Sequence, residues 1–125
     1  MELGALQNDS CARTLWRAAL GGALAVGLST APAAAGQAAY GTVYNVMPYL
    51  NGSGLMFFSQ AGSTTGHPAC ATQPRWVINL STPGGQAAAS TIITAYATGK
   101  PIAVTGTGSC ADWGDTESIL FVVTQ

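Results

Sequence analysis

The residues best suited to chemistry lie in one short segment near the C-terminus. Residues 105–117 read TGTGSCADWGDTE and contain three glycines, one cysteine and three carboxylates. A phosphate-binding loop would need the pattern G-x-x-x-x-G-K-[ST] between a strand and a helix. The Gly-Lys pair of this chain, Gly99-Lys100, is followed by proline. The pattern therefore excludes a nucleotide-binding loop of this type.

The three carboxylates raise the alternative of a calcium site. Asp112, Asp115 and Glu117 lie within six positions of one another. Their spacing does not match an EF-hand loop, and neighbouring carboxylates in a turn are more often hydrated than bound to metal. We predict no metal and no cofactor, with calcium as the alternative at this segment.

Two cysteines can form a stabilising disulfide bond. Cys11 lies in the leader predicted below, which leaves Cys70 and Cys110 to pair in an oxidising compartment. Closing a loop of about 40 residues stabilises a fold by roughly 3 to 4 kcal/mol through loop-closure entropy. Under this interpretation residues 105–117 form a tied turn, with a hairpin tip at 112–116. A metal pair or reactive thiol would need more ligands than His67.

Catalytic groups are sparse. His67 is the only histidine, and its neighbours Gly66 and Pro68 place it in a loop, where a histidine is usually solvated. Two carboxylates that hydrolyse a glycoside must face each other across a cleft, which adjacent positions on an exposed hairpin do not do. No serine lies in a G-x-S-x-G elbow. We therefore predict that the protein is not an enzyme.

The aromatic residues favour binding. Tyrosines of the first predicted strand and Trp113 at the loop tip offer flat apolar faces with polar edges, which suit sugar rings. Trp113, beside two aspartates and a glycine, is expected to be the least buried. The predicted ligand contacts are Trp113, Asp112, Asp115, Tyr40 and Tyr44. The aromatic residues expected in the core are Phe57, Trp76 and Phe121.

Charge limits the class of ligand. The whole chain is 7% charged with a formal net charge of −1. After position 35 the charged side chains are Arg75, Lys100, Asp112, Asp115 and Glu117. A nucleic-acid interface needs a basic patch that neutralises phosphates. The composition excludes such an interface and favours a polar, uncharged ligand.

Five strands and one helix are expected to position these residues. The predicted strands cover residues 40–49, 55–59, 75–80, 101–105 and 118–124. The first two form a hairpin around the turn residues 51–54. In the third, Trp76, Ile78 and Leu80 alternate with Val77 and Asn79, which is typical of a half-buried strand. The order β-β-β-α-β-β predicts an all-β fold with one helix, a five-stranded OB-fold barrel stapled by one disulfide.

The helix has clear boundary signals. Ser81 or Thr82 can cap its N-terminus, Pro83 is tolerated in its first turn, and Gly99 followed by Pro101 ends it. Its polar face carries no charge. That face is either covered by a neighbouring subunit or a weakly polar solvent surface, and the sequence favours neither. The positions that recur at helical spacing are Ala88, Ile92, Ala95 and Tyr96.

The N-terminal third resembles an export leader. Arginines at 13 and 17 precede an apolar run over residues 18–28 and a small-residue stretch ending at Ala35. This is the layout of a secretory signal with an A-x-A cleavage site, and the run is too short to span a bilayer comfortably. We predict a signal peptide at 1–35 and one OB-fold domain at 36–125, without a membrane span, in a secreted or periplasmic protein.

A resemblance to a known family adds to this interpretation. Residues 69–106 combine a cysteine, a tryptophan strand ending at Ser81-Thr82, a helix closing on Thr98-Gly99-Lys100-Pro101 and a further strand. This arrangement resembles the receptor-binding B subunits of subtilase-type AB5 cytotoxins and their pertussis-like relatives. The resemblance implies an exported OB-fold domain that assembles as a homopentameric ring and binds glycans on host cells. It leaves two alternatives open, a partner of a toxin A subunit and a stand-alone exported protein without one.

The sequence thus predicts a non-catalytic binding protein. It would recognise a carbohydrate or protein ligand through the first strand and residues 105–117, and a ring of weak sites would gain avidity. The alternative is a monomeric periplasmic binding or inhibitor module with a protein ligand.

Overall fold

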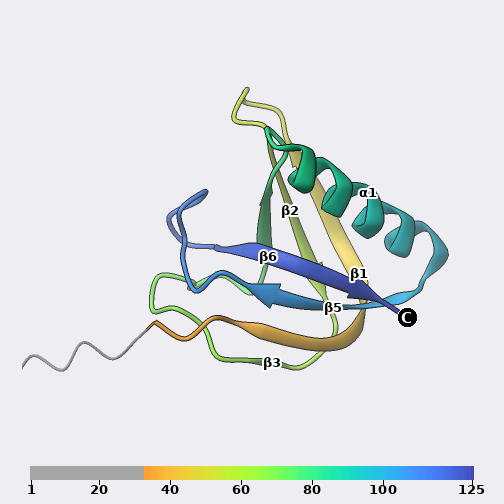
Figure 1. Cartoon of the computed structure of the whole chain (residues 1–125), viewed down its shortest axis with the longest axis horizontal. Helices are drawn as coiled ribbons and strands as arrows, with labels where there is room; N and C mark the ends of the chain where they lie inside the picture. The colour runs from red at the N-terminus through yellow and green to blue at the C-terminus, as the bar shows by residue number, and fades with distance from the viewer. Residues whose placement is uncertain (1–32) are drawn as a thin grey trace, which may run out of the picture. The chain divides into compact units, whose positions relative to one another are not determined.

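The computed structural model describes residues 33–125, so the predicted leader lies almost wholly outside the described residues. Within this range the structure is mostly β with one helix, as predicted (Figure 1). The elements in chain order are β1 (Gln37–Tyr49), β2 (Leu55–Gln60), β3 (Thr64–Thr65), β4 (Trp76–Asn79), α1 (Pro83–Thr98), β5 (Pro101–Gly106) and β6 (Glu117–Thr124). All five predicted strands are present, and the two-residue β3 is an addition that its length hid from pattern analysis.

The strand pairings return on themselves. The sheet has the order β2-β4-β6-β5-β1-β3, and β1 also pairs with β2. The first half of β1 pairs with β5 and its second half with β2, so one long strand joins both ends of the sheet. Figure 1 shows β1 curving from the side of β3 and β5 to the β1–β2 hairpin. Only β4 and β6 are parallel, over two residue pairs, Trp76 with Glu117 and Val77 with Ser118.

Two irregularities bend β1. The register shifts between Ala38 and Gly41 in the pairing with β5, and between Tyr44 and Met47 in the pairing with β2. At the second shift Asn45 has a positive φ of 57°, a conformation that asparagine tolerates better than most residues. Bulges of this kind bend a strand and increase its twist. The bends allow β1 to pair with β5 along its first half and with β2 along its second half.

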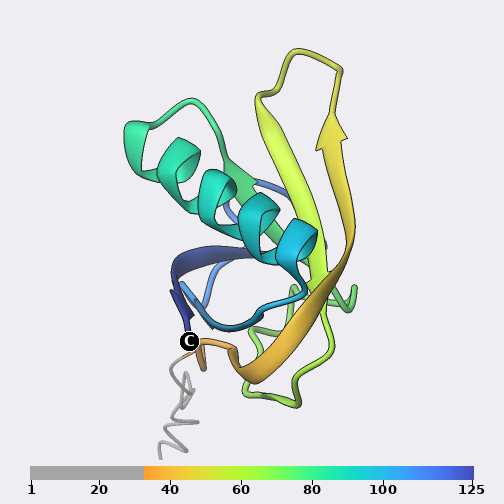
Figure 2. The same ribbon diagram turned by 90° about the vertical axis from the view of Figure 1, so that its right-hand side faces the viewer.

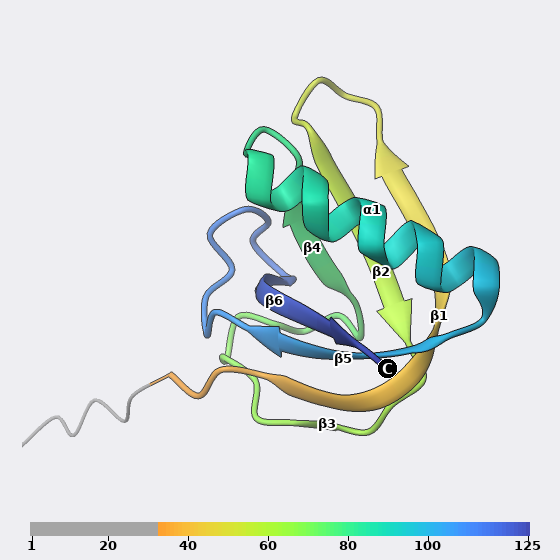
Figure 3. The same cartoon turned by 45° about the vertical axis from the view of Figure 1, so that its right-hand side comes forward.

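The helix begins and ends as its sequence predicts. Thr82 is the N-cap and accepts a hydrogen bond from Gly85 N, and Gly99 ends the helix with a φ of 68°. The buried positions of α1 are Ala89, Ile92 and Ala95, whereas Tyr96 is half exposed. Figure 2 shows α1 beside the β1–β2 hairpin, and in Figure 3 the helix runs from the end of β4 to the start of β5. It contacts β1, β4, β5 and β6.

The core has two parts, which explains two wrong predictions. Ile92 of α1 packs in the main cluster with residues that include Met56, Phe58, Trp76, Ile78, Ile102 and Val104. A second cluster, Leu55, Phe57 and Val77, covers the opposite face of β2 and β4. The strand β4 is therefore buried on both faces instead of half-buried. Phe121, predicted in the core, is 50% exposed, because the register shift opposite Thr105 and Gly106 leaves Ile119 and Val122 packed against the main cluster instead.

Candidate functional site

A pocket beside β1 gathers the most varied chemistry in the described chain. It has a volume of about 250 Å³ and lies where residues 60–76, between β2 and β4, pass near the first strand. We call it the Tyr44 pocket. Its polar and aromatic lining consists of Tyr44, Gln60, Thr64, His67, Arg75 and Trp76. The lining brings together hydroxyl, amide, imidazole and guanidinium groups around two aromatic rings.

Gln60, in the lining of this pocket, has an unused hydrogen-bond donor. The residue is 8% exposed, and its Oε1 accepts a hydrogen bond of 2.7 Å from Gly62 N. That bond fixes the orientation of the amide, so Nε2 is the remaining donor. Nε2 has no partner among the described residues. An unsatisfied buried donor costs roughly 1 to 3 kcal/mol, and because Nε2 is closed to solvent a ligand oxygen would reach it only after the pocket lining shifts.

Aromatic groups flank that donor. Tyr44 of β1 is 52% exposed and so presents its ring and hydroxyl at the pocket rim. Trp76 of β4 is buried and lies behind His67, with ring centroids 6.0 Å apart. Aromatic rings beside hydrogen-bonding groups suit a ligand that has both apolar faces and hydroxyls. Tyr40, the other predicted tyrosine of β1, is exposed but does not line this pocket.

Glu117 lies near His67 and corrects an expectation. It was expected in a hydrated turn, but its side chain is only 1% exposed because the first residue of β6 pairs beside Trp76. Oε1 accepts hydrogen bonds from Gly36 N at 2.9 Å and Gly108 N at 2.8 Å. Oε2 lies 3.5 Å from His67 Nδ1 and has no hydrogen-bond partner in residues 33–125. The carboxylate belongs to the interior, not to the loop surface.

The loop from β5 to β6 is a tied turn. The disulfide between Cys70 and Cys110 is present, with 6.2 Å between the Cα atoms. Asp112 accepts hydrogen bonds from Asn79 Nδ2 at 3.1 Å and from Ser118 Oγ at 2.7 Å. Each carboxylate of the loop therefore has its own partners, and they do not converge. No group of three potential metal ligands occurs in the described part of the chain.

Asp115 forms the other anchor of this loop. Its Oδ1 accepts hydrogen bonds from Thr116 Oγ1 at 2.6 Å and Arg75 Nη2 at 3.2 Å. The Thr116 hydroxyl contributes most to lowering the pKa of Asp115 from its ordinary value of 3.8, burial opposes this, and Arg75 lowers the pKa further. Arg75 Nε also donates to Thr116 Oγ1 at 3.0 Å. The three side chains form one polar network beside the Tyr44 pocket.

The lowered pKa of Asp115 predicts an acid-dependent loss of stability. Because the folded state holds this carboxyl ionised more strongly than the unfolded state does, the contribution is present above about pH 4 and lost as pH falls below it. Thermal melts of the wild type and Asp115→Asn should differ at pH 6 and converge toward pH 2. A difference that stays constant over this range would contradict the network.

Trp113 is half-buried, not the free tip that the sequence predicts. Its ring packs edge-on against Tyr49, with centroids 5.1 Å apart, and against Phe57, with centroids 5.3 Å apart. We call these three residues the aromatic cluster. The guanidinium carbon of Arg75 lies 4.5 Å from the centroid of Phe57, so Arg75 borders both this cluster and the Tyr44 pocket. The predicted contacts Trp113, Asp112 and Asp115 thus lie on a neighbouring surface.

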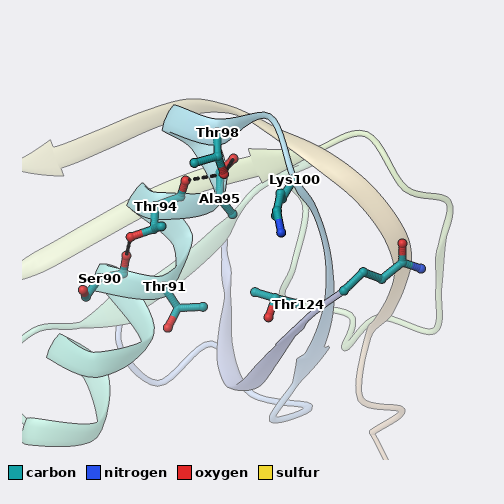
Figure 4. Close-up of a pocket in the computed structure, with 8 residues that line it drawn as sticks. Ser90, Thr91, Thr94, Ala95, Thr98, Lys100 and Thr124 are labelled. Atoms are coloured by element: carbon teal, nitrogen blue, oxygen red, sulfur yellow. Dashed lines mark hydrogen bonds between the residues drawn. The ribbon is translucent and has the colours of Figure 1, made fainter.

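A second pocket lies beside the C-terminal half of α1 (Figure 4). Its volume is about 300 Å³, and it includes Lys100 and Thr124. The hydroxyls of Thr91, Thr94 and Thr98 donate to carbonyl groups one turn earlier in the helix. Their donors are therefore already used. Its lining contains no aromatic ring, in contrast to the Tyr44 pocket.

Sequence analysis identified Tyr44 but missed most of the pocket. Gln60, Thr64 and Arg75 are separate polar residues whose proximity depends on how residues 60–76 fold back. His67 was considered as a catalyst and as a metal ligand, not as a binding residue. A glutamine that ends a mostly apolar strand, LMFFSQ, is the one local signal, because it places an amide at the edge of the core.

Comparison with known proteins finds no matching family model, no matching curated relative and no matching solved structure. Within residues 33–125, α1 lacks the length and apolar character needed to cross a bilayer.

Proposed function

We propose that this protein is an exported, non-catalytic binding protein that recognises a carbohydrate at the Tyr44 pocket. The observation that carries the proposal is the buried Nε2 of Gln60, a donor without a partner among the described residues of a pocket with an aromatic rim. A sugar offers a hydroxyl to accept that hydrogen bond and a C–H face to pack on a ring. The low charge of the chain agrees with an uncharged ligand.

The pocket chemistry suits recognition better than reaction. Thr64 and Tyr44 have hydroxyls, which both donate and accept hydrogen bonds, and Arg75 is already held by Asp115 and Thr116. The interior carboxylate of Glu117 is covered by Gly36, Gly108 and His67. Such a site would hold a sugar ring through several fixed groups, with affinity limited by its small volume.

An OB-fold barrel and membership of the toxin B-subunit-like family are part of this proposal. Five long strands, a helix after the third of them, and a β1 that pairs with both β2 and β5 support the barrel. A homopentamer would multiply weak sites into useful avidity. Uncharged surfaces support the assembly, since half-exposed apolar residues occur on α1 and on β6: Ile93, Tyr96, Leu120, Phe121 and Val123.

A protein ligand is the second candidate. The exposed side chains of Leu120, Phe121 and Val123 form an apolar strand surface without charge. Apolar surface that is contiguous often marks a protein interface. A monomeric periplasmic module would use this surface for a partner, and native mass spectrometry distinguishes a monomer from a ring of five.

Binding to a glycan array tests the carbohydrate proposal. Tyr44→Ala is expected to abolish binding, and Gln60→Leu to weaken it at least tenfold, because a bound sugar oxygen would lose its donor. Trp113→Ala is the matched control, since it removes an aromatic ring of the neighbouring surface while leaving the pocket lining intact. Circular dichroism of each variant monitors folding.

The pattern among the variants locates the ligand. Loss of binding with Trp113→Ala alone would move the site to the aromatic cluster and contradict the Tyr44 pocket. A wild-type protein that binds no glycan but captures a protein through β6 would replace the carbohydrate proposal with the second candidate.

A further inference from the structure

The buried carboxylate of Glu117 lacks a full counter-charge in the described chain. Its side chain is 1% exposed, and its ionic contact is His67 Nδ1 at 3.5 Å, which is a cation only when protonated. The other ion pair of residues 33–125 joins Arg75 to Asp115. Burying a carboxylate without a cation or a complete set of hydrogen bonds is strongly unfavourable. Oε2 has neither a hydrogen-bond donor nor solvent.

Gly36 lies directly against this carboxylate. Its main-chain nitrogen donates to Oε1 at 2.9 Å, and its carbonyl accepts a hydrogen bond of 2.7 Å from Gly106 N. A Cβ added at Gly36 would overlap Oε2 and would come within 2.9 Å of the Trp76 ring. The site therefore admits a glycine nitrogen and excludes a side chain. Gly36 is also the first residue after the predicted cleavage site.

We propose that Glu117 is the receptor for the α-ammonium group that export processing creates at Gly36. The proposal rests on the exported function above. A leader peptidase would hydrolyse the Ala35–Gly36 peptide bond while the chain is unfolded: water supplies a hydroxyl to the Ala35 carbonyl carbon and a proton to the Gly36 nitrogen. The Ala35 carboxylate leaves with the leader, and the new amine gains a further proton from solvent.

The new terminus would supply the counter-charge and the hydrogen-bond donors that the carboxylate of Glu117 lacks. A peptide nitrogen at this position has one N–H and no charge, whereas an ammonium has three N–H groups and a positive charge at neutral pH. With its nitrogen near 2.9 Å from Oε1, the ammonium also faces the neighbouring Oε2. The pair is enclosed by Trp76, His67 and the glycines at 106 and 108. Processing thereby gives the buried carboxylate of Glu117 a charged partner inside the domain.

Amine labelling of the exported wild-type protein tests this directly. A chain that begins at Gly36 has two amines, the α-amine and the ε-amine of its single lysine, Lys100. A free α-amine, with a pKa of about 8, reacts with an acylating reagent faster than a lysine does near pH 7. We expect the reverse order in the folded protein, with Gly36 labelled at least tenfold more slowly than Lys100. Unfolding in urea should restore the usual order.

A mutant cycle supplies the energetic test. One full-length variant carries a threonine inserted after Ala35, which displaces the new amine by one residue, and the second carries Glu117→Gln. The insertion is expected to lower the Tm by roughly 10 °C in the wild-type background and by much less in Glu117→Gln, because the ion pair is already absent there. If Glu117→Gln does not fold, the labelling order decides the proposal.

Measuring the intact mass distinguishes failure of the ammonium-receptor proposal from failure of the predicted processing. A chain that begins at Gly36 and labels rapidly there overturns the ammonium receptor but leaves the exported binding protein standing. A chain that retains its leader, or begins elsewhere, overturns the receptor and the predicted processing together. Glycan binding is measured on the same samples, so failure of the carbohydrate proposal is seen separately.

Discussion

Cys110→Ser is expected to lower the Tm by more than about 10 °C. The disulfide joins residues 40 positions apart, and loss of that loop closure removes roughly 3 to 4 kcal/mol from the free energy of unfolding. The domain has few charged residues and a small core, so this staple is a large share of its stability. Differential scanning calorimetry under non-reducing conditions measures the shift.

Further cysteine variants control this experiment. Cys70→Ser should give the same shift, and the double variant should be no less stable than either single one, because all three remove one bond. Cys11→Ser, within the predicted leader, should leave the Tm of the processed protein unchanged. An unaltered Tm in Cys110→Ser would refute the stabilising role of the bridge.

Gly41→Ala is expected to destabilise the domain by about 3 kcal/mol or more, because the added methyl group meets main chain, not a movable side chain. An ideal Cβ at Gly41 overlaps the nitrogen of Gly62 and crowds Gln60 Oε1. Hydrogen bonds fix this close approach: Ala39 N donates to Ser63 O at 2.9 Å, and Ala61 N donates to Thr42 O at 3.0 Å. The clash therefore cannot be relieved without moving β1.

Gly84→Ala is the matched control for this change. No atom lies within 4 Å of a Cβ added there, and the residue is near the start of α1. Alanine favours helix over glycine, so the variant should be more stable by up to about 1 kcal/mol. Urea unfolding followed by circular dichroism measures both variants. Equal stability of Gly41→Ala and the wild type would contradict the described path of β1.

Local signals predicted the elements well, and long-range pairing was harder. Thr82 and Gly99 mark the ends of α1 because capping depends on neighbouring residues alone. The burial of Val77 and the exposure of Phe121 were missed because they depend on what packs against each face of a strand. Pattern shows that a face is apolar, but it does not show whether the rest of the chain is large enough to cover that face.

Prediction of the candidate site was limited in the same way by contacts between distant parts of the chain. The pairing of Cys70 with Cys110 could be predicted because, with Cys11 assigned to the leader, each of them had one possible partner. Glu117 was placed in a hydrated turn because it lies within six positions of Asp112 and Asp115 in a glycine-containing segment. Its burial follows from strand pairing: β6 begins one residue earlier than predicted, and this residue, Glu117, pairs with Trp76 of β4. Which strand covers a residue at the start of β6 depends on contacts between distant parts of the chain.

The parallel contact between β4 and β6 gives the disulfide a second significance. This contact has two residue pairs and is the shortest junction in the ring of the five long strands. Each cysteine lies a few positions before one of these two strands, so the bridge clamps the junction from its open end. A reduced chain would still fold but would lose that clamp, so we expect the two-pair contact between β4 and β6 to be the first part of the ring to open when the disulfide is broken.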